Sequence, residues 1–375
     1  MLLFTPGPTP VPESVRLAMA TPTLHHRTPE FEAIFKETRE ALFDLFGTDE
    51  VVMLASTGTG AMEAAVTNLC HDTLLNVNAG KFGERFGKIA QAHGLGNVEI
   101  KHEWDTPATA EEVITALKAN PSVDAVAVQI SESAGGLRHP VEEIAAAVKA
   151  HDPKIMVIAD GITAVGVERI DVTHIDALIA GSQKALMLPP GLAIIGLSEA
   201  AIEKIGEGKG YYFNLATEIK KQRQNTTAYT AATTLIIGLR AILKEISQRG
   251  GLGKLYCDTA RRAKATRFAL EALGLHIYPK SPAKSMTTVD DPNAKEIRDL
   301  LKTDFGVNVA GGQDHLKGKI FRINQMGLIE PYEMVAAVNA VELALAKLGR
   351  REFDGTASRV FNEEYFKSAL KREDA

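Results

Sequence analysis

Residues 177–197 read ALIAGSQKALMLPPGLAIIGL and are the most informative segment about the architecture of the chain. It holds two apolar runs, Ala177–Ala180 and Leu192–Leu197, joined by a connection that contains one lysine, two prolines and two glycines. Each run is short, nearly all apolar and bounded by turn residues, which is typical of a strand buried on both faces. The stretch therefore predicts two buried strands with a partly polar loop between them.

Similar apolar runs precede this stretch at Ala125–Ile130 and Ile155–Ala159. Between them, Val141–Ala150 carries apolar residues at the spacing of one helix face. Strands that alternate with helices in this way are the sequence signature of βαβ units around a largely parallel sheet. We therefore expect an α/β domain that includes about residues 51–197.

The pattern changes after Ser198, where a loop rich in glycine and tyrosine is followed by a second set of elements. Helices are predicted near residues 230–246, 255–273, 294–303 and 331–348, and short strands near 276–279, 285–289, 307–310 and 320–323. We expect a large domain of residues 15–254 and a smaller α+β domain made of residues 1–14 and 255–375. The segment after Arg350 is mixed in charge, and a surface helix is expected there.

Composition excludes several classes of function. The chain has 375 residues, of which 45% are hydrophobic and 24% charged, as is ordinary for soluble globular proteins. Its 42 Lys and Arg residues against 47 Asp and Glu residues give a net charge of −5, so no basic excess is available for a nucleic acid backbone. There is no uncharged apolar stretch of ~18–20 residues, no basic secretory leader, and there are only two cysteines. We expect a cytoplasmic protein without nucleic acid or membrane partners.

The first candidate for chemistry is the turn Ser56–Gly60, which lies between an apolar strand at 51–54 and an alanine-rich helix at 61–69. A small-residue turn before a helix presents free backbone N–H groups and the positive end of the helix dipole, which suits a phosphate group. A simple helix cap explains the same residues, and this alternative stays open. The turn has neither the Gly-Lys-Ser/Thr of a P-loop nor the G-x-G-x-x-G spacing of a dinucleotide site.

Asp160 and Lys184 each follow a predicted buried strand. Open α/β sheets bind their ligands at the carboxyl ends of the strands. Asp160 would need a cationic or hydrogen-bonding partner there, although a cap on the following helix is the alternative. Lys184 lies among small and apolar residues, and burial would lower its pKa and make its neutral amine a nucleophile. Because one helical crossover separates the two residues, both side chains are expected to reach one pocket.

A phosphate-binding turn, a strand-end aspartate and a strand-end lysine together are what pyridoxal 5′-phosphate (PLP) requires. The lysine would form the Schiff base, and the aspartate would pair with the protonated pyridine nitrogen. The helix N-terminus would bind the phosphate. The combination is far more specific than its parts, and PLP is the predicted cofactor.

Motifs along most of the chain resemble those of fold-type I, class V aminotransferases, and of the alanine–glyoxylate and serine–pyruvate branch in particular. The matching motifs are Phe4–Pro8, Ser56–Ala65, Gly80–Gly83, Ser131–Gly136, Ala159–Gly161, Gly181–Lys184 with Pro189–Gly191, Tyr229–Ala232 and Phe321–Ile323. The resemblance implies a fold with a large, mostly parallel mixed-sheet domain and a smaller α+β C-terminal domain. It also implies a homodimer whose active sites combine residues of both subunits.

The resemblance implies a role for each matching residue. Lys184 matches the catalytic lysine, Asp160 the partner of the pyridine nitrogen, and Arg322 the arginine that grips the α-carboxylate of the substrate, with Gly7 as a second substrate-binding position. The further cofactor-binding matches are Thr57, Gly58 and Thr59 in the phosphate turn, Gln183 beside the phosphate, Phe82 on the ring face, Ser133 near the ring hydroxyl, Ile162 two residues after Asp160, and Thr227 and Thr230 from the second subunit.

The expected activity is transamination by a ping-pong mechanism, with alanine or serine as favoured donors and glyoxylate or pyruvate as acceptors. Aspartate is a less favoured donor, because no additional arginine is identified for its side-chain carboxylate. Two departures from the family pattern bear on substrate preference: Asn324-Gln325 follow the arginine, and Ala231-Ala232 replace a turn with proline. His25-His26 lack a third ligand at a suitable spacing, so no metal is expected.

Two alternatives stay open. A class V cysteine desulfurase or related lyase would carry a histidine before the lysine, whereas Gln183 stands there and Phe82 occupies the ring position. Such an enzyme also needs a reactive cysteine, but Cys70 and Cys257 lie in predicted helices and are interpreted as packing residues. The other alternative is a non-catalytic PLP-fold subunit, which loss of the lysine would mark, and Lys184 is present.

Overall fold

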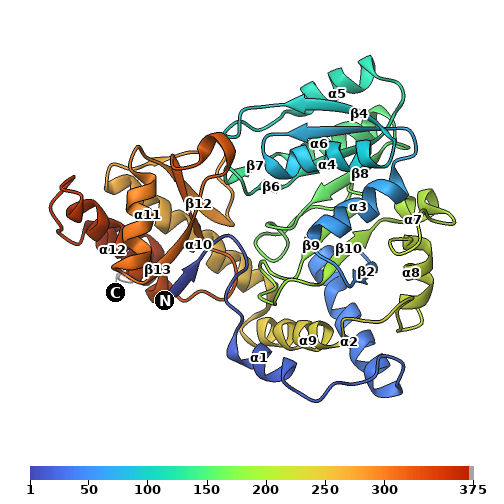
Figure 1. Cartoon of the computed structure of the whole chain (residues 1–375), viewed down its shortest axis with the longest axis horizontal. Helices are drawn as coiled ribbons and strands as arrows, with labels where there is room; N and C mark the ends of the chain where they lie inside the picture. The colour runs from blue at the N-terminus through green and yellow to red at the C-terminus, as the bar shows by residue number, and fades with distance from the viewer. Residues whose placement is uncertain (371–375) are drawn as a thin grey trace, which may run out of the picture.

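Two main β-sheets organise the chain, and the computed structural model describes its residues 1–370. The larger sheet has seven strands in the order β2-β10-β9-β8-β5-β3-β4 (Figure 1). Strand β10 is antiparallel to both of its neighbours, and the other adjacent pairs are parallel. The bounds are β2 (Glu50–Leu54), β3 (Thr73–Asn78), β4 (Gly96–Lys101), β5 (Val123–Gln129), β8 (Met156–Asp160), β9 (Ala177–Gly181) and β10 (Ala193–Leu197). The predicted large, mostly parallel mixed sheet is confirmed.

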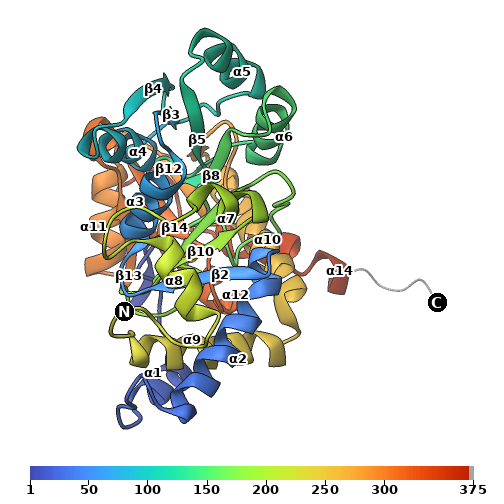
Figure 2. The ribbon, with the colours of Figure 1, turned by 90° about the vertical axis from the view of Figure 1, so that its right-hand side faces the viewer.

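Helices cover both faces of this sheet (Figure 2). Successive residues of a strand point to opposite faces, so Val126 and Val128 of β5 join one core cluster while Ala125 and Ala127 join the other. Burial on both faces explains why the strands read as continuous apolar runs. The first face is covered by α2 (Pro29–Phe46), α5 (Ala110–Ala119), α6 (Val141–His151) and α9 (Thr233–Gln248), and the second by α3 (Gly58–Leu69), α4 (Lys81–Ala92), α7 (Glu199–Ile205) and α8 (Leu215–Gln222).

The carboxyl ends of β2, β8 and β9 lie at one edge of the sheet, because these three strands run in the same direction. The turn Ser56–Gly60, Asp160 and Lys184 all lie at these strand ends. A small hairpin of β6 (Ser131–Glu132) and β7 (Leu137–Arg138) follows β5 at the same edge. The topology thus gathers chemistry-bearing residues from four strands into one region.

The second sheet has five strands in the order β1-β13-β14-β12-β11. Figure 1 shows its first strand, drawn in dark blue, among orange elements from the C-terminal third of the chain. This strand, β1 (Leu2–Phe4), is parallel to β13 (Val307–Gly311). The other elements of this unit are β11 (His276–Ile277), β12 (Met286–Asp290), β14 (Ile320–Asn324), α10 (Gly251–Ala272), α11 (Ala294–Thr303), the 3₁₀ turn Asp314–Leu316 and α12 (Pro331–Lys347). We propose residues 1–14 and 255–375 as one domain and 15–254 as the other.

Two helices differ from the sequence-based expectation. Helix α10 begins at Gly251, because left-handed Gly250 (φ 106°) turns the chain directly from α9 into it. The expected surface helix after Arg350 is α13 (Thr356–Tyr365), and its Phe361 is fully buried in the core of the small unit. A short helix α14 (Lys367–Leu370) follows, and the rest of the tail lies outside the described residues.

The two units contact each other beside the hairpin of β6 and β7. The amide of Arg138 donates to the carbonyl of Ser281 at 2.8 Å, and the amide of Ala283 donates to the carbonyl of Gly136 at 2.9 Å. These backbone bonds hold the segment before β12 against the hairpin. The small unit is thereby positioned over the strand ends that carry Asp160 and Lys184.

The remaining helix, α1 (Glu13–Met19), packs against α9. None of the helices within residues 1–370 combines the length and apolar character that a bilayer crossing requires. In the same residues, no group of three or more His, Cys, Asp or Glu side chains is placed to hold a metal ion.

Candidate active site

Lys184 lies three residues after β9 and beneath the N-terminal segment of the chain. Its amine donates to the carbonyl of Pro6 at 2.5 Å, while the hydroxyl of Thr9 donates to the carbonyl of Lys184 at 2.7 Å. A Cβ at Gly7 would lie 2.6 Å from the Lys184 amine, and Gly7 has φ 122°, so this close approach requires glycine. The predicted substrate-binding position Gly7 is therefore in direct contact with the predicted catalytic lysine.

The pKa of Lys184 is lowered to about 8, chiefly because burial disfavours the ammonium ion. The positive charge of Arg322 lowers the pKa further, and the carboxylate of Asp160 opposes both effects. The neutral amine, which is the form needed of a nucleophile or a base, is consequently a minor form near neutral pH but far more populated than in an ordinary lysine.

Asp160 is the last residue of β8 and is buried. One carboxylate oxygen, Oδ1, accepts from the amide of Ile162 at 2.9 Å, and no other hydrogen bond to the Asp160 side chain is present among the described residues. Burial raises the pKa of Asp160 to about 6, against the opposing charges of Lys184 and Arg85. A carboxylate in this setting is stabilised by an additional cationic N–H donor.

The phosphate turn leads into α3 without a side-chain cap. Thr57 is the N-cap residue, but its side chain makes no capping bond, in contrast to the N-cap residues Thr28 of α2 and Ser198 of α7. The amides of the first turn of α3 are therefore left for another acceptor. Exposed Thr57 and Thr59 flank buried Gly58 at this end of the helix.

Two further predicted residues lie against this turn. A Cβ at Gly58 would come within 2.3 Å of Ile162 Cδ1, so Ile162 packs directly on the turn. The side-chain oxygen of Gln183 is buried and has no hydrogen-bond partner among the described residues. A Cβ at Gly181, the last residue of β9, would lie 3.0 Å from that oxygen and 3.7 Å from the Gly58 amide nitrogen. The loop after β9 and the phosphate turn are thus neighbours.

Phe82 lies in the first turn of α4 and is half-buried. The guanidinium of Arg85 lies 4.7 Å from the centre of its ring, and Nη1 of Arg85 donates to the Thr59 hydroxyl at 2.8 Å. Arg85 therefore links the predicted ring-stacking residue to the phosphate turn. The sequence analysis missed Arg85, whose only local signal is its position three residues after Phe82 on one helix face.

Arg322 comes from β14 of the small sheet and is buried. Its Nη1 donates to the Ser133 carbonyl at 2.5 Å, and its Nε and Nη2 donate to the Gly311 carbonyl at 3.2 and 2.6 Å. Three of the five guanidinium N–H groups are used in this way, which leaves two for a ligand. Burial lowers the pKa of Arg322 to about 10, and the charge of Glu132 opposes this effect. The side chain thus stays cationic at neutral pH.

The hydroxyl of buried Ser133 makes no hydrogen bond to the described residues, although its carbonyl binds Arg322. Thr227 and Thr230 are not joined to this group by any hydrogen bond in residues 1–370. The Thr227 hydroxyl donates to the Tyr229 carbonyl at 2.5 Å, and Thr230 is exposed. One chain therefore brings together the other predicted site residues but not these two threonines.

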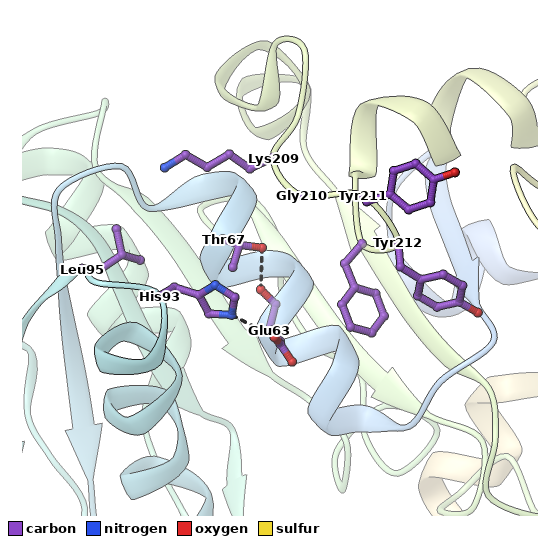
Figure 3. A pocket seen from close by; sticks show the side chains of 9 residues that line it. Glu63, Thr67, His93, Leu95, Lys209, Gly210, Tyr211 and Tyr212 are labelled. Atoms are coloured by element: carbon purple, nitrogen blue, oxygen red, sulfur yellow. Dashed lines mark hydrogen bonds and ion pairs between the residues drawn. The ribbon is translucent and has the colours of Figure 1, made fainter.

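A separate cavity of about 350 Å³ lies beside α3 (Figure 3). In its wall, the side chains of Glu63 and His93 contact each other at 2.8 Å. None of the predicted site residues lines it; the lining residues are Glu63, Thr67, His93, Leu95 and Lys209–Phe213. This surface cavity is distinct from the group around Lys184.

The two cysteines differ from each other. Cys70 is buried, as expected of a packing residue, and burial raises the pKa of its thiol to about 12. Cys257 is exposed, so its interpretation as a packing residue is wrong. Its neighbour Leu255 faces the core, and two residues along a helix is enough to turn Cys257 toward solvent.

Comparison with known proteins identifies the family of the chain. The family model for class V aminotransferases matches residues 2–327. The chain belongs to this family. This class V aminotransferase is therefore a PLP-dependent enzyme, as the resemblance of its motifs predicts.

Three relatives illustrate the likeness. The chain is 52% identical over 367 residues to an uncharacterized aminotransferase of Helicobacter pylori, a match that covers 98% of this chain and 100% of that protein. It is 30% identical to a serine–glyoxylate aminotransferase of Methylorubrum extorquens, over 94% of this chain and 93% of the other. An aspartate aminotransferase structure from Thermus thermophilus has a TM-score of 0.86 and 31% identity, over 92% of this chain and 99% of that chain.

The residues at the strand ends fit PLP. The uncapped start of α3 offers amides to a phosphate. The carboxylate of Asp160 accepts one hydrogen bond and forms no ion pair within residues 1–370, and the lowered pKa of Lys184 makes its neutral amine more available than that of an ordinary lysine. The unpartnered oxygen of Gln183 adds a hydrogen-bond acceptor in the same place.

The lowered pKa of Lys184 gives a direct prediction for the protein without cofactor. Labelling by a trace amount of a small acylating reagent, measured at Lys184 by peptide mass spectrometry, should be half-maximal near pH 8, compared with the ordinary value of 10.5. In Arg322→Gln the midpoint should move upward, because a neighbouring positive charge has been removed. A midpoint near 10.5 in both proteins would contradict the electrostatic description of the site.

Proposed function

We propose that this class V aminotransferase transfers the amino group of a small amino acid, alanine or serine, to glyoxylate or pyruvate by a ping-pong mechanism. The observation that carries the proposal is the juxtaposition of Lys184 and Asp160 at one edge of the large sheet with Arg322 of the small sheet. Asp160 and Arg322 both act electrostatically on Lys184. The relative that acts as a serine–glyoxylate aminotransferase supports the choice of substrates.

Each of these residues has a task that follows from its geometry. The two unused N–H groups of Arg322 suit the α-carboxylate of an amino acid, which planar guanidinium binds in a bidentate manner. The neutral amine of Lys184 takes the proton from the α-carbon and returns it. The free carboxylate oxygen of Asp160 stabilises a positive charge placed opposite it. When bound, PLP supplies an electron sink for the negative charge that develops at the α-carbon.

The N-terminal segment has a role in the same mechanism. The Pro6 carbonyl accepts from the Lys184 amine, and the Thr9 hydroxyl donates to the Lys184 carbonyl. Gly7 leaves room for the amine between them. When Lys184 acts on a substrate, its amine must leave the Pro6 carbonyl. The segment therefore positions the lysine at rest and limits the access of water to it.

The donor is tested by the visible absorption spectrum of the PLP-loaded protein during separate additions of alanine, serine, aspartate and cysteine. Alanine or serine should change the spectrum, and glyoxylate or pyruvate should restore it, because the amino group is stored on the enzyme between two half-reactions. A response to aspartate alone would identify aspartate as the donor in place of alanine and serine, as the name of the Thermus thermophilus relative suggests. Sulfide release with cysteine would favour a desulfurase. The absence of a spectral response to any donor would favour a non-catalytic subunit.

The role of Asp160 is tested by Asp160→Ala. We expect the turnover number to fall by about 100-fold or more, because a charge placed in advance is a dominant catalytic contribution. The fold should be retained, because burial disfavours the ionised Asp160 side chain. The matched control is exposed Asp171→Ala, which should retain wild-type turnover. Wild-type turnover in Asp160→Ala would contradict the assignment.

We further propose that the protein is a homodimer with composite active sites. We also propose a cytoplasmic location, because a chain of this length with only two cysteines is typical of a reducing compartment. Tyr211 and Tyr212 are 81% and 43% exposed, and both contact Tyr229, with ring centres 5.5 and 5.2 Å apart (Figure 3 shows the first two). An exposed aromatic cluster beside Thr227 and Thr230 is a suitable surface for a second copy.

The composite site is tested by mixing two inactive variants. Lys184→Ala removes the catalytic amine, and Thr230→Glu places a negative charge where the partner's phosphate would bind. After unfolding and refolding together, half of the dimers are mixed and each regains one intact site, so about a quarter of wild-type activity should return. Each variant refolded alone serves as the control. No recovery in verified mixed dimers would show that Thr230 serves its own subunit.

A further inference from the structure

Glu132 is a buried carboxylate that joins two separate parts of the candidate site. It is fully inaccessible to solvent in the hairpin of β6 and β7. Oε2 accepts from the amides of Phe82 and Gly83 at 2.9 and 3.0 Å, and Oε1 accepts from the amide of Ala134 at 2.9 Å. A single side chain therefore binds the start of α4 and the segment next to Ser133.

The same carboxylate provides the cap that α4 lacks locally. The N-cap residue is Gly80, which has no side chain, and the second and third amides of the helix donate to Glu132 instead. A Cβ at Gly80 would lie 2.4 Å from the carboxyl carbon of Glu132, so the glycine makes room for this cap. The negative charge also interacts favourably with the positive end of the helix.

Glu132 further acts on Arg322, because its negative charge favours the guanidinium form. Arg322 in turn donates to the carbonyl of Ser133. The residues around Glu132 thus include the predicted ring-stacking residue Phe82, the predicted ring-hydroxyl neighbour Ser133 and the predicted carboxylate-binding arginine.

We propose that Glu132 is the positioning residue that fixes Phe82 and Ser133 relative to each other, and so sets the orientation of the cofactor ring. The proposal rests on the proposed function, because it uses the cofactor-binding roles of these two residues. Misplacement of a bound reactant by about 1 Å can cost about 100-fold in rate, so a residue that acts only through others still affects turnover.

The test variant is Glu132→Gln, which keeps the size of the side chain and removes its charge. An amide has one accepting oxygen, whereas three backbone N–H groups on two segments need an acceptor. Either the pair at Phe82 and Gly83 or the amide of Ala134 would face an NH₂ group. The link between the two segments is therefore broken whichever way the amide is oriented.

Glu342 offers a matched control in the small unit. It too is fully buried, and it accepts from the amides of Asp354, Thr356 and Ala357 at 3.3, 3.2 and 2.9 Å, at the start of α13. Glu342→Gln removes the same charge from a similar helix cap, and it also removes an ion pair with Arg351 at 3.2 Å. It should lower thermal stability as Glu132→Gln does, but leave the cofactor site unchanged.

Three readouts on the purified variants separate positioning from stability: the visible circular dichroism of the bound cofactor, the PLP dissociation constant of the apo protein, and kcat with KM. In Glu132→Gln we expect an altered dichroic band, weaker PLP binding by about 10-fold and a kcat lower by about 10- to 100-fold. In Glu342→Gln all three should equal those of the wild type at temperatures where the protein is folded.

A wild-type dichroic band and kcat in folded Glu132→Gln would overturn the proposal. If that variant does not fold, Gly80→Ala gives the same test, because the added methyl group displaces the carboxylate without removing it; an unchanged band would then overturn the proposal. The proposed function fails separately, through absence of PLP binding or transamination in the wild-type protein and in Glu342→Gln.

Discussion

Mutual compensation of buried charges is the constraint on which the site depends. Lys184, Asp160, Glu132 and Arg322 are all largely removed from water where the two units meet, and each taken alone would carry a large desolvation cost. Two are acids and two are bases. The negative charge of Asp160 opposes the lowering of the Lys184 pKa by burial, and that of Glu132 opposes the lowering of the Arg322 pKa. The compensation is incomplete for all four, so the pKa values of Lys184 and Arg322 fall while those of Asp160 and Glu132 rise.

The four charged groups differ in how they are hydrogen-bonded. Glu132 and Arg322 are held by backbone amides and carbonyls, whereas Asp160 has one amide donor and Lys184 one carbonyl acceptor in residues 1–370. The first pair is suited to a fixed structural task, although Arg322 keeps two free donors. The second pair is suited to bind and react, because each of its side chains has a single hydrogen-bond partner and keeps further capacity for a ligand.

Chain topology brings these groups together from distant parts of the sequence. The parallel arrangement of β2, β8 and β9 puts the phosphate turn, Asp160 and Lys184 at one edge. The N-terminal strand β1 belongs to the small sheet, so the residues that follow it cross over Lys184 on their way to the large unit. Arg322 enters from the opposite unit, and its bond to Ser133 links small-unit strand β14 to the hairpin that follows β5.

The large sheet, the turn before α3 and the strand-end positions of Asp160 and Lys184 could be predicted from the sequence, because apolar runs and turn residues indicate burial and strand ends locally. The pairing of Arg85 with Phe82 and Thr59 was decided by the tertiary structure, as was the capping of α4 by Glu132 across fifty residues of chain. The exposure of Cys257 was misjudged and the burial of Phe361 was missed, because a helical pattern does not indicate which neighbour covers each face. Local patterns fix which residues are buried on average, but the partner of a buried polar group depends on how distant segments pack.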